Sequence, residues 1–455
     1  MRRFLFQLAF LACGLPCQGM VSGIYRRRHP EQSDLYRIAF HHFEAYEKTY
    51  PERYEAEYGY LRKIVPATVA RYLDCGIMEN GFARVRCPAC GHDFFVAFSC
   101  KTRFFCPSCA EKRTLIWSAW VKAHVLKNVA HRQWVFTIPK ALRKLFTRDR
   151  QLLGELAQCA SETILELYQA VFPDPQFRPG IITSTQTFGD LLVWHPHIHC
   201  LVSDGVFDGD GAFHPGPKAD PETAALIFRE KVFAMLQGRE RISDGLVEKM
   251  RQWHHSGFSV HDEVVIRRED REALGRLAQY VVHASFAAGK IRYVEQTGCV
   301  MYKSKMHLGK KRNFEVLDAI EFLHRVCLHI PDPYEAVIRY YGHYANAARG
   351  KRKKLGLEEA AAPVVVDDAP DGRTCRRSWA RLIYQVYEVD PLKCPKCGEQ
   401  MRMIAFILER EEVICILRHL KMWPIEYPKP CPIDARASPL SLELLQKQLE
   451  SRHIN

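Results

Sequence analysis

The sequence predicts an α+β protein. We expect a helical and cysteine-rich module first, then a central, mainly antiparallel sheet with helices, and finally a small C-x-x-C module. Three observations support this prediction. Short alternating runs, typical of strands, are separated by stretches with helical period. Cysteine pairs at C-x-x-C spacing stand before and after these runs. A chain of 455 residues is also too long for one ordinary core, so two or three domains are expected.

The order of elements follows from periodicity. Helices are expected in 34–72, 111–128, 152–171 and 270–283. Strands are expected at 133–139, 181–188, 197–202 and 258–267, with a hairpin over 291–305 that turns near Gly298. A linker is expected where Ala, Pro and acidic residues replace the periodic pattern, after the basic run that ends at Lys354.

Composition restricts the function classes. Hydrophobic residues make up 47% of the chain, which excludes a disordered or fibrous protein. The 65 Lys and Arg against 52 Asp and Glu give a net charge of +13, which favours a polyanionic partner such as DNA or RNA. Six of the 17 cysteines stand in C-x-x-C pairs, which indicates metal binding in a reducing compartment instead of disulfides.

The N-terminal segment resembles a signal peptide, because Met1-Arg2-Arg3 precedes a short apolar run at 4–15. We prefer to interpret 1–22 as a non-native or accidental extension ahead of a true start near Met20. That run is too short to span a bilayer, and no membrane partner is expected.

The first cysteine motif combines Cys87-Pro-Ala-Cys90-Gly91 with Cys106-Pro-Ser-Cys109. Two such turns match a zinc ribbon, in which four thiolates close a tetrahedron around a structural Zn²⁺. The alternative is a set of buried cysteines in a small hairpin. Three residues close by are candidates for additional or substitute ligands: Cys75, His92 and Cys100.

The second cysteine motif is the C-terminal pair Cys394 and Cys397. We expect this pair either to complete a second small zinc site or to be the remnant of one. Cys415, His419 and Cys431 are the candidates for its remaining ligands, although Cys415 and His419 have helical spacing and can simply pack.

The third motif is His195-Pro-His197-Ile-His199. On a strand, His197 and His199 project from the same face about 7 Å apart, so both imidazoles can reach one ion. Ile198 and Leu201 are expected on the opposite face. The alternative is an ordinary buried or exposed histidine pair.

Tyr280 lies on the expected helix 270–283, at the edge of a face formed by Leu274, Leu277, Ala278 and Val281. A tyrosine that merely packs at a boundary is the alternative, and spacing alone cannot choose among 19 tyrosines.

Cations alternate with aromatic residues near the end of the central domain, as a channel for single-stranded nucleic acid requires. A solvated basic surface is the alternative. The candidate DNA-binding residues are Lys303, Lys305, Arg339, Lys351, Arg352, Lys353 and Lys354.

In this order, the motifs resemble the rolling-circle insertion-sequence transposases of the HUH endonuclease superfamily that carry an N-terminal zinc-binding domain. The matching stretches are Cys100–Cys109, Gln186–Gly189 with His195–His199, the Tyr280 helix, and His329-Ile-Pro-Asp followed by Arg339-Tyr-Tyr-Gly. The resemblance covers most of the chain, from about Tyr25 to Trp423.

The resemblance implies an HUH-type central sheet and a transposase that nicks and joins single-stranded DNA. His197 and His199 would bind a catalytic Mg²⁺ or Mn²⁺, and Tyr280 would form a 5′-phosphotyrosine link. Gln186 and His283 are candidates for a third metal ligand. The partner would be single-stranded ends of the mobile element, in the nucleoid of a bacterial cytoplasm.

The implied domain bounds are 23–130 for the helical and zinc-binding domain, 131–354 for the catalytic domain, 355–376 for the linker and 377–455 for the C-terminal module.

One residue departs from the two-tyrosine pattern Y-x-x-x-Y, because Arg276 stands where the first tyrosine would be. Tyr340 and Tyr344 have that spacing outside this helix. The alternative functions are a non-catalytic zinc-dependent DNA-binding protein, or a replication initiator or relaxase.

Overall fold

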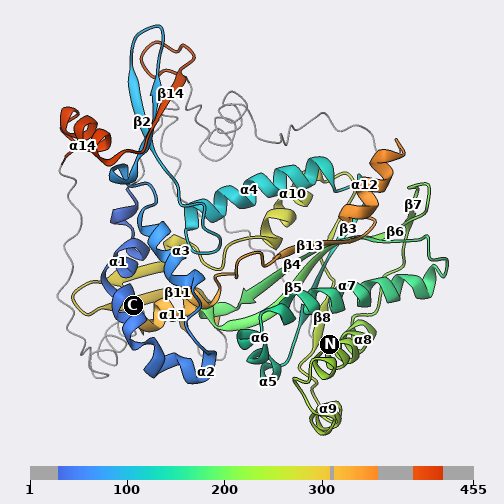
Figure 1. Cartoon of the computed structure of the whole chain (residues 1–455). Helices are drawn as coiled ribbons and strands as arrows, with labels where there is room; N and C mark the ends of the chain where they lie inside the picture. Colours follow the sequence, from blue (N-terminus) through green and yellow to red (C-terminus); the bar gives the residue numbers. More distant parts are fainter. Residues whose placement is uncertain (1–28, 308–311, 357–392, 424–455) are drawn as a thin grey trace, which may run out of the picture.

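The computed structural model describes residues 29–307, 312–356 and 393–423 (Figure 1). The expected extension 1–22 and most of the expected linker lie outside the described residues. Mixed helices and antiparallel sheets confirm the predicted α+β class.

The central sheet is antiparallel, in the strand order β13-β4-β5-β3-β8, and β9 also pairs with β3. Its strands are β3 (His131–Thr137), β4 (Gly180–Phe188), β5 (Trp194–Ser203), β8 (Ser259–His261), β9 (Val265–Ile266) and β13 (Ile338–Gly342). The histidine motif therefore lies on β5, in the middle of the sheet.

Helices cover both faces of this sheet. On one face, α7 (Gln151–Val171) and α8 (Pro221–Gly238) pack against apolar residues of β5 such as Ile198 and Val202. On the other face lie α4 (Pro107–His124) and α10 (Arg271–Val281), which contact each other (Figure 1). The remaining elements of this body are α5 (Lys140–Arg143), α6 (Leu145–Arg148), α9 (Asp244–Arg251), β6 (Gly205–Phe207), β7 (Phe213–Pro215) and α12 (Asn346–Lys354).

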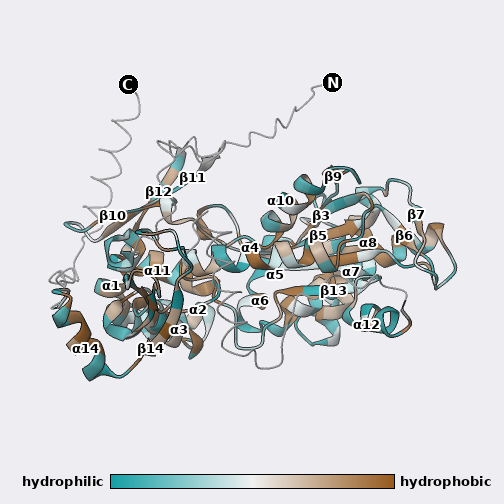
Figure 2. Cartoon of the chain, turned by 90° about the horizontal axis from the view of Figure 1, so that it is seen from above, coloured by the Kyte–Doolittle hydropathy of each residue, from teal (hydrophilic) through white to brown (hydrophobic). Residues whose placement is uncertain are grey.

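A second body combines two distant parts of the sequence. Its elements are α1 (Asp34–Tyr50), α2 (Ala56–Tyr58), α3 (Ile64–Leu73), β10 (Ile291–Val294), β11 (Cys299–His307), β12 (Arg312–Asp318) and α11 (Ala319–Leu328). They share one hydrophobic core. Arg62, between α2 and α3, forms an ion pair with Asp332, which follows α11, with 2.6 Å between Nη1 and Oδ1. Figure 2 shows the two bodies side by side. The domain bounds expected from the sequence stay a prediction. The hydrophobic core of the second body contains residues from both sides of the expected boundary at 130/131.

A three-stranded sheet projects from the second body, in the order β14-β1-β2. Its strands are β1 (Phe82–Arg86), β2 (Asp93–Ala97) and β14 (Arg402–Ile407), and α14 (Arg410–His419) follows. Within the described residues, the segment after the linker thus adds a third strand, β14, to the N-terminal hairpin. Within the described ranges, no helix is long and apolar enough to cross a membrane.

Candidate active site and metal centres

The three histidines of the β5 motif project from the face of the sheet that α4 and α10 cover. The ring centroids of His195 and His197 lie 5.0 Å apart, and those of His197 and His199 lie 4.9 Å apart. His197 and His199 are buried. Strand alternation places them on one face, as predicted, and Ile198 on the other. The expectation for Leu201 is wrong: this residue packs with α10 on the histidine face, since it is two residues from His199.

Hydrogen bonds orient the two central imidazoles. Nδ1 of His197 lies 2.7 Å from the carbonyl oxygen of His195, so Nδ1 carries the proton and Nε2 has a free lone pair. Nδ1 of His199 lies 3.0 Å from the side-chain amide of Gln133, on the neighbouring strand β3. His197 therefore keeps a free lone pair on Nε2, whereas the amide nitrogen of Gln133 donates to Nδ1 of His199 and leaves the proton of that ring on Nε2.

Burial keeps this histidine pair neutral at physiological pH. Desolvation lowers the pKa of His197 to about 4, and it also lowers the pKa of His199 well below its ordinary value. A neutral imidazole is the form that binds a metal ion. The pair therefore has the protonation state that an ion site needs.

Tyr280 lies opposite these histidines, near the C-terminal end of α10. Its ring centroid is 5.7 Å from that of His199 and 5.1 Å from that of His283. The side chain is 53% exposed, because the apolar face of α10 turns Leu277 and Val281 inward and leaves Tyr280 at the edge. Partial burial and the negative charge of Asp190 raise its pKa, so a cation at this site would help to ionise the phenol.

The other tyrosines with Y-x-x-x-Y spacing are differently placed. Tyr344 is fully buried, with its hydroxyl 2.8 Å from Nε2 of His131. The hydroxyl of Tyr340 accepts a hydrogen bond from Trp117 at 2.9 Å. Neither tyrosine lies on α10, and each hydroxyl already has a hydrogen-bond partner.

Both candidates for a third metal ligand lie close by. Gln186 is the cross-strand neighbour of His197, but its amide donates to the carbonyl of Val281 at 3.0 Å. Nδ1 of His283 contacts the carbonyl oxygen of Tyr280. Among the described residues, neither histidine belongs to a group of three or more His, Cys, Asp or Glu ligand atoms that all lie within 4.8 Å of one another. The contact of Gln133 with His199 was not predicted from the sequence. The only local indication of it is that the expected strand 133–139 begins with a polar residue.

Eight cysteines form two clusters of four, and neither cluster has the composition predicted from the sequence. The expected set of Cys87, Cys90, Cys106 and Cys109 is wrong as a single tetrahedron, because its two knuckles lie in different clusters. The buried cysteine cluster consists of Cys75, Cys100, Cys106 and Cys109, and the hairpin cysteine cluster consists of Cys87, Cys90, Cys394 and Cys397.

The buried cysteine cluster lies at the N-terminus of α4, inside the core of the second body. Sγ of Cys75 is 3.9 Å from that of Cys106, and Sγ of Cys100 is 3.6 Å from that of Cys109. Tetrahedral zinc with bonds of about 2.3 Å requires sulfur atoms about 3.8 Å apart, so the residues fit the metal. Cys75 and Cys100, which the sequence indicated as additional or substitute ligands, take the places expected for Cys87 and Cys90 in this set.

The hairpin cysteine cluster joins two similar knuckles. Cys87 and Cys397 approach to 3.5 Å between sulfur atoms, as do Cys90 and Cys394. The knuckle glycines, Gly91 and Gly398, have φ values of 70° and 78°, which residues with a Cβ adopt rarely. Cys394 and Cys397 thus belong to a four-cysteine site and are not a remnant. Cys415 and His419 are not members of it, and Cys431 lies outside the described residues.

The predicted DNA-binding cations do not form one patch. Lys303 and Lys305 belong to β11 in the second body, whereas Lys351, Lys353 and Lys354 lie on the exposed surface of α12. Arg352 donates to the carbonyl of His343 at 2.8 Å. Arg339 lies against Gly154 of α7, so this side chain is on the sheet face opposite the histidines.

Comparison with known proteins identifies two domains. Residues 42–138 match the family model "Transposase zinc-binding domain", of the IS91 type. Residues 180–352 match the family model "Putative transposase" (Y2_Tnp). No solved structure gives a significant match.

Two curated relatives span most of the chain. The "Transposase for insertion sequence element IS801" of Pseudomonas savastanoi pv. phaseolicola is 26% identical over 366 residues, covering 77% of this chain and 86% of the relative. The "Putative transposase y4qJ" of Sinorhizobium fredii is 23% identical over 352 residues, covering 72% of this chain and 83% of the relative. The two domains occur in the expected order, and the chain therefore carries a transposase zinc-binding domain of the IS91 type followed by a domain of the putative transposase family.

Proposed function

We propose that the chain nicks and joins single-stranded DNA through a 5′-phosphotyrosine intermediate, as in rolling-circle transposition. The observation that carries the proposal is the convergence of Tyr280 with His197 and His199 on one face of the central sheet, with 5.7 Å between the Tyr280 and His199 rings. A nucleophile and two metal-binding imidazoles at this separation can contact the same phosphodiester.

The step exchanges one ester bond for another. The phenolic oxygen of Tyr280 attacks the phosphorus atom and gives up its proton, while the bond to the 3′ oxygen breaks. That oxygen takes up a proton and leaves as a 3′-hydroxyl. Joining is the reverse reaction, in which a 3′-hydroxyl of another strand attacks the phosphotyrosine and releases the phenol.

His197 and His199 would hold a Mg²⁺ or Mn²⁺ ion, which would polarise the phosphate and favour the ionised phenol. His197 already presents Nε2 with a lone pair. For His199 to do the same, Nδ1 must donate its proton to the oxygen of the Gln133 amide, which half a turn of that amide achieves. We therefore assign Gln133 the role of fixing the imidazole of His199.

Only one nucleophile is proposed. Arg276 precedes Tyr280 by one helical turn and is exposed, with a 3.6 Å ion pair to Glu272. A cation at this position can bind a phosphate of the same strand, but it cannot form a second covalent link.

The test is a covalent adduct between the full chain and 3′-labelled random single-stranded DNA in the presence of Mg²⁺. The wild type should form a labelled adduct that survives denaturing electrophoresis. Tyr280→Phe should abolish it while DNA binding changes less than twofold, because only the reacting oxygen is lost. Tyr334→Phe, at a fully exposed tyrosine outside α10, is the matched control and should retain the adduct.

Two results would contradict the proposal. An adduct that persists in Tyr280→Phe would mean that another residue is the nucleophile. DNA binding without any adduct in the wild type would favour the non-catalytic DNA-binding protein.

A further inference from the structure

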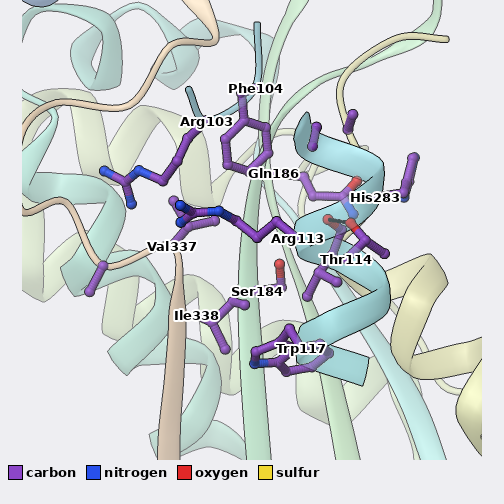
Figure 3. A pocket seen from close by; sticks show the side chains of 14 residues that line it. Arg103, Phe104, Arg113, Thr114, Trp117, Ser184, Gln186, His283, Val337 and Ile338 are labelled. Atoms are coloured by element: carbon purple, nitrogen blue, oxygen red, sulfur yellow. Dashed lines mark hydrogen bonds between the residues drawn. The ribbon is translucent and has the colours of Figure 1, made fainter. Parts of the chain in front are cut away.

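A cavity of about 290 Å³ lies beside the histidine face, between α4 and the strands β4 and β13 (Figure 3). Ser184 and Gln186 form part of its floor, and Phe104, Trp117, Val337 and Ile338 provide apolar walls. Protein sites for whole small molecules occupy roughly 300–1,000 Å³. This cavity is at the lower end of that range, so it suits one planar ring system and excludes a base pair.

The walls of the cavity are suited to a flat ring. Trp117 is held in place by the hydrogen bond from Nε1 to the hydroxyl of Tyr340. Phe104 belongs to the segment between Cys100 and Cys106, two members of the buried cysteine cluster. Its backbone has a φ of 61°, an unusual value for a phenylalanine, which indicates that the surrounding segment fixes its position.

Polar groups in the cavity can bind the edge of a base and its phosphate. Arg103 donates to the carbonyls of Asp332 and Glu335 at 3.0 and 2.9 Å. Arg113 extends across the cavity toward Val337 in Figure 3. Among the ion pairs of the described residues, neither arginine pairs with a carboxylate, so neither positive charge is neutralised by a salt bridge. The amide of Gln186 uses its nitrogen on Val281, which leaves its oxygen as an acceptor.

The cavity is continuous with the proposed catalytic centre. Ser184 and Gln186 are the direct cross-strand partners of His199 and His197 on β4 and β5. His283 lines the cavity, and its ring stacks on Tyr280 at 5.1 Å. A phosphate held between Tyr280 and the histidines would therefore place a neighbouring base at the mouth of this cavity.

We infer that this cavity binds one unstacked nucleobase of the single strand, next to the phosphate that Tyr280 attacks. The inference rests on the proposed function for the position of the strand. Aromatic and aliphatic walls would hold the ring by stacking, which is worth an appreciable part of single-strand affinity. Arg103 and Arg113 would contact the edge of the base and the adjoining phosphate.

The test measures binding of the full chain with Tyr280→Phe, so that no covalent reaction interferes. The first probe is a fluorescent pool of random 20-nucleotide single strands. The second is an oligomer of equal length built entirely of abasic units, which keeps the phosphates and lacks the bases. Ala336→Leu and, independently, Ala284→Leu place an aliphatic side chain in the cavity. Ala119→Leu, at an exposed position of α4 that does not line the cavity, is the matched control.

Both cavity variants should weaken binding of the random pool about tenfold and leave binding of the abasic oligomer unchanged. Ala119→Leu should change neither affinity. Unchanged affinity for the pool in both cavity variants, or an equal loss on both probes, would overturn the inference.

This result is separable from the adduct assay. If the wild type forms no adduct but Ala336→Leu still removes the base-dependent affinity, the base cavity stands and the cleavage proposal fails. If the adduct forms and neither cavity variant affects the pool, the cleavage proposal stands and the cavity inference fails.

Discussion

The two cysteine clusters have the same ligand chemistry in different surroundings. Three of the four ligands in the buried cysteine cluster are buried and the fourth, Cys100, is half-buried, within the core that unites the second body. In the hairpin cysteine cluster, Cys90 and Cys397 are exposed, and only a small group around Val85 and Met401 packs beneath the knuckles. Two four-cysteine sites can therefore differ in the elements that they connect and in the rate at which a bound metal ion dissociates.

Their positions relative to the active site also differ. The buried cysteine cluster brackets the loop that carries Arg103 and Phe104, and it lies at the start of α4, which reaches the histidine face. The hairpin cysteine cluster fastens β14 to β1, between cysteines 304 and 310 residues apart. The first is coupled to the cavity beside Tyr280, whereas the second holds the C-terminal segment.

The largest expected effect is that of Cys106→Ser in the buried cysteine cluster. Loss of one ligand should release one zinc ion and lower the free energy of unfolding by more than about 4 kcal/mol, since the metal supports the core of the second body. Metal analysis and urea unfolding measure the two quantities. Cys159→Ser, at a buried cysteine of α7 outside both clusters, is the control and should keep all its zinc. A folded Cys106→Ser protein of wild-type stability would show that this cluster is not structural.

A smaller effect is expected from Cys397→Ser in the hairpin cysteine cluster. One zinc ion should again be lost, but the central sheet should unfold at an unchanged urea concentration. Amide hydrogen exchange should instead rise locally, in β14 and α14, because the knuckle fastens these elements to the hairpin.

Cys415→Ser, at an exposed cysteine of α14, serves as the control and should leave zinc content and exchange unaltered. Equal losses of global stability in Cys397→Ser and Cys106→Ser would remove the distinction between the clusters.

The smallest expected effect is a difference in the rate at which zinc dissociates from the two clusters. With a chelator in excess, zinc should leave the wild type in two phases of equal amplitude, and the faster phase should come from the hairpin cysteine cluster, where two ligands are exposed. Cys397→Ser should lack the fast phase and retain the slow one. A chromogenic zinc indicator follows both phases. A single phase, or loss of the slow phase in Cys397→Ser, would contradict the assigned order.

Local sequence patterns predicted much of the fold and part of the candidate site. The alternation over 197–202 correctly placed His197 and His199 on one face of a strand, and the apolar positions of 270–283 left Tyr280 at the edge of α10. The hairpin that turns near Gly298 is also confirmed. These features depend on backbone geometry within a few residues, which the sequence specifies directly.

Contacts between distant segments were decided only by the tertiary structure. Each cysteine knuckle offers two ligands, and its spacing contains no information about which other pair will complete the tetrahedron. Here Cys75 and Cys100 complete the buried set, and β14, as a third strand, brings Cys394 and Cys397 to Cys87 and Cys90.

The same limit applies to the catalytic face. Gln133 meets His199 because β3 and β5 pair in one particular register, and the cavity exists because α4 crosses the sheet beside β4. The sequence by itself determined the type and local direction of the candidate ligands. Burial of the two cores and the pairing of strands distant in sequence determined which of those residues meet, because these interactions depend on the whole chain and not on any local period.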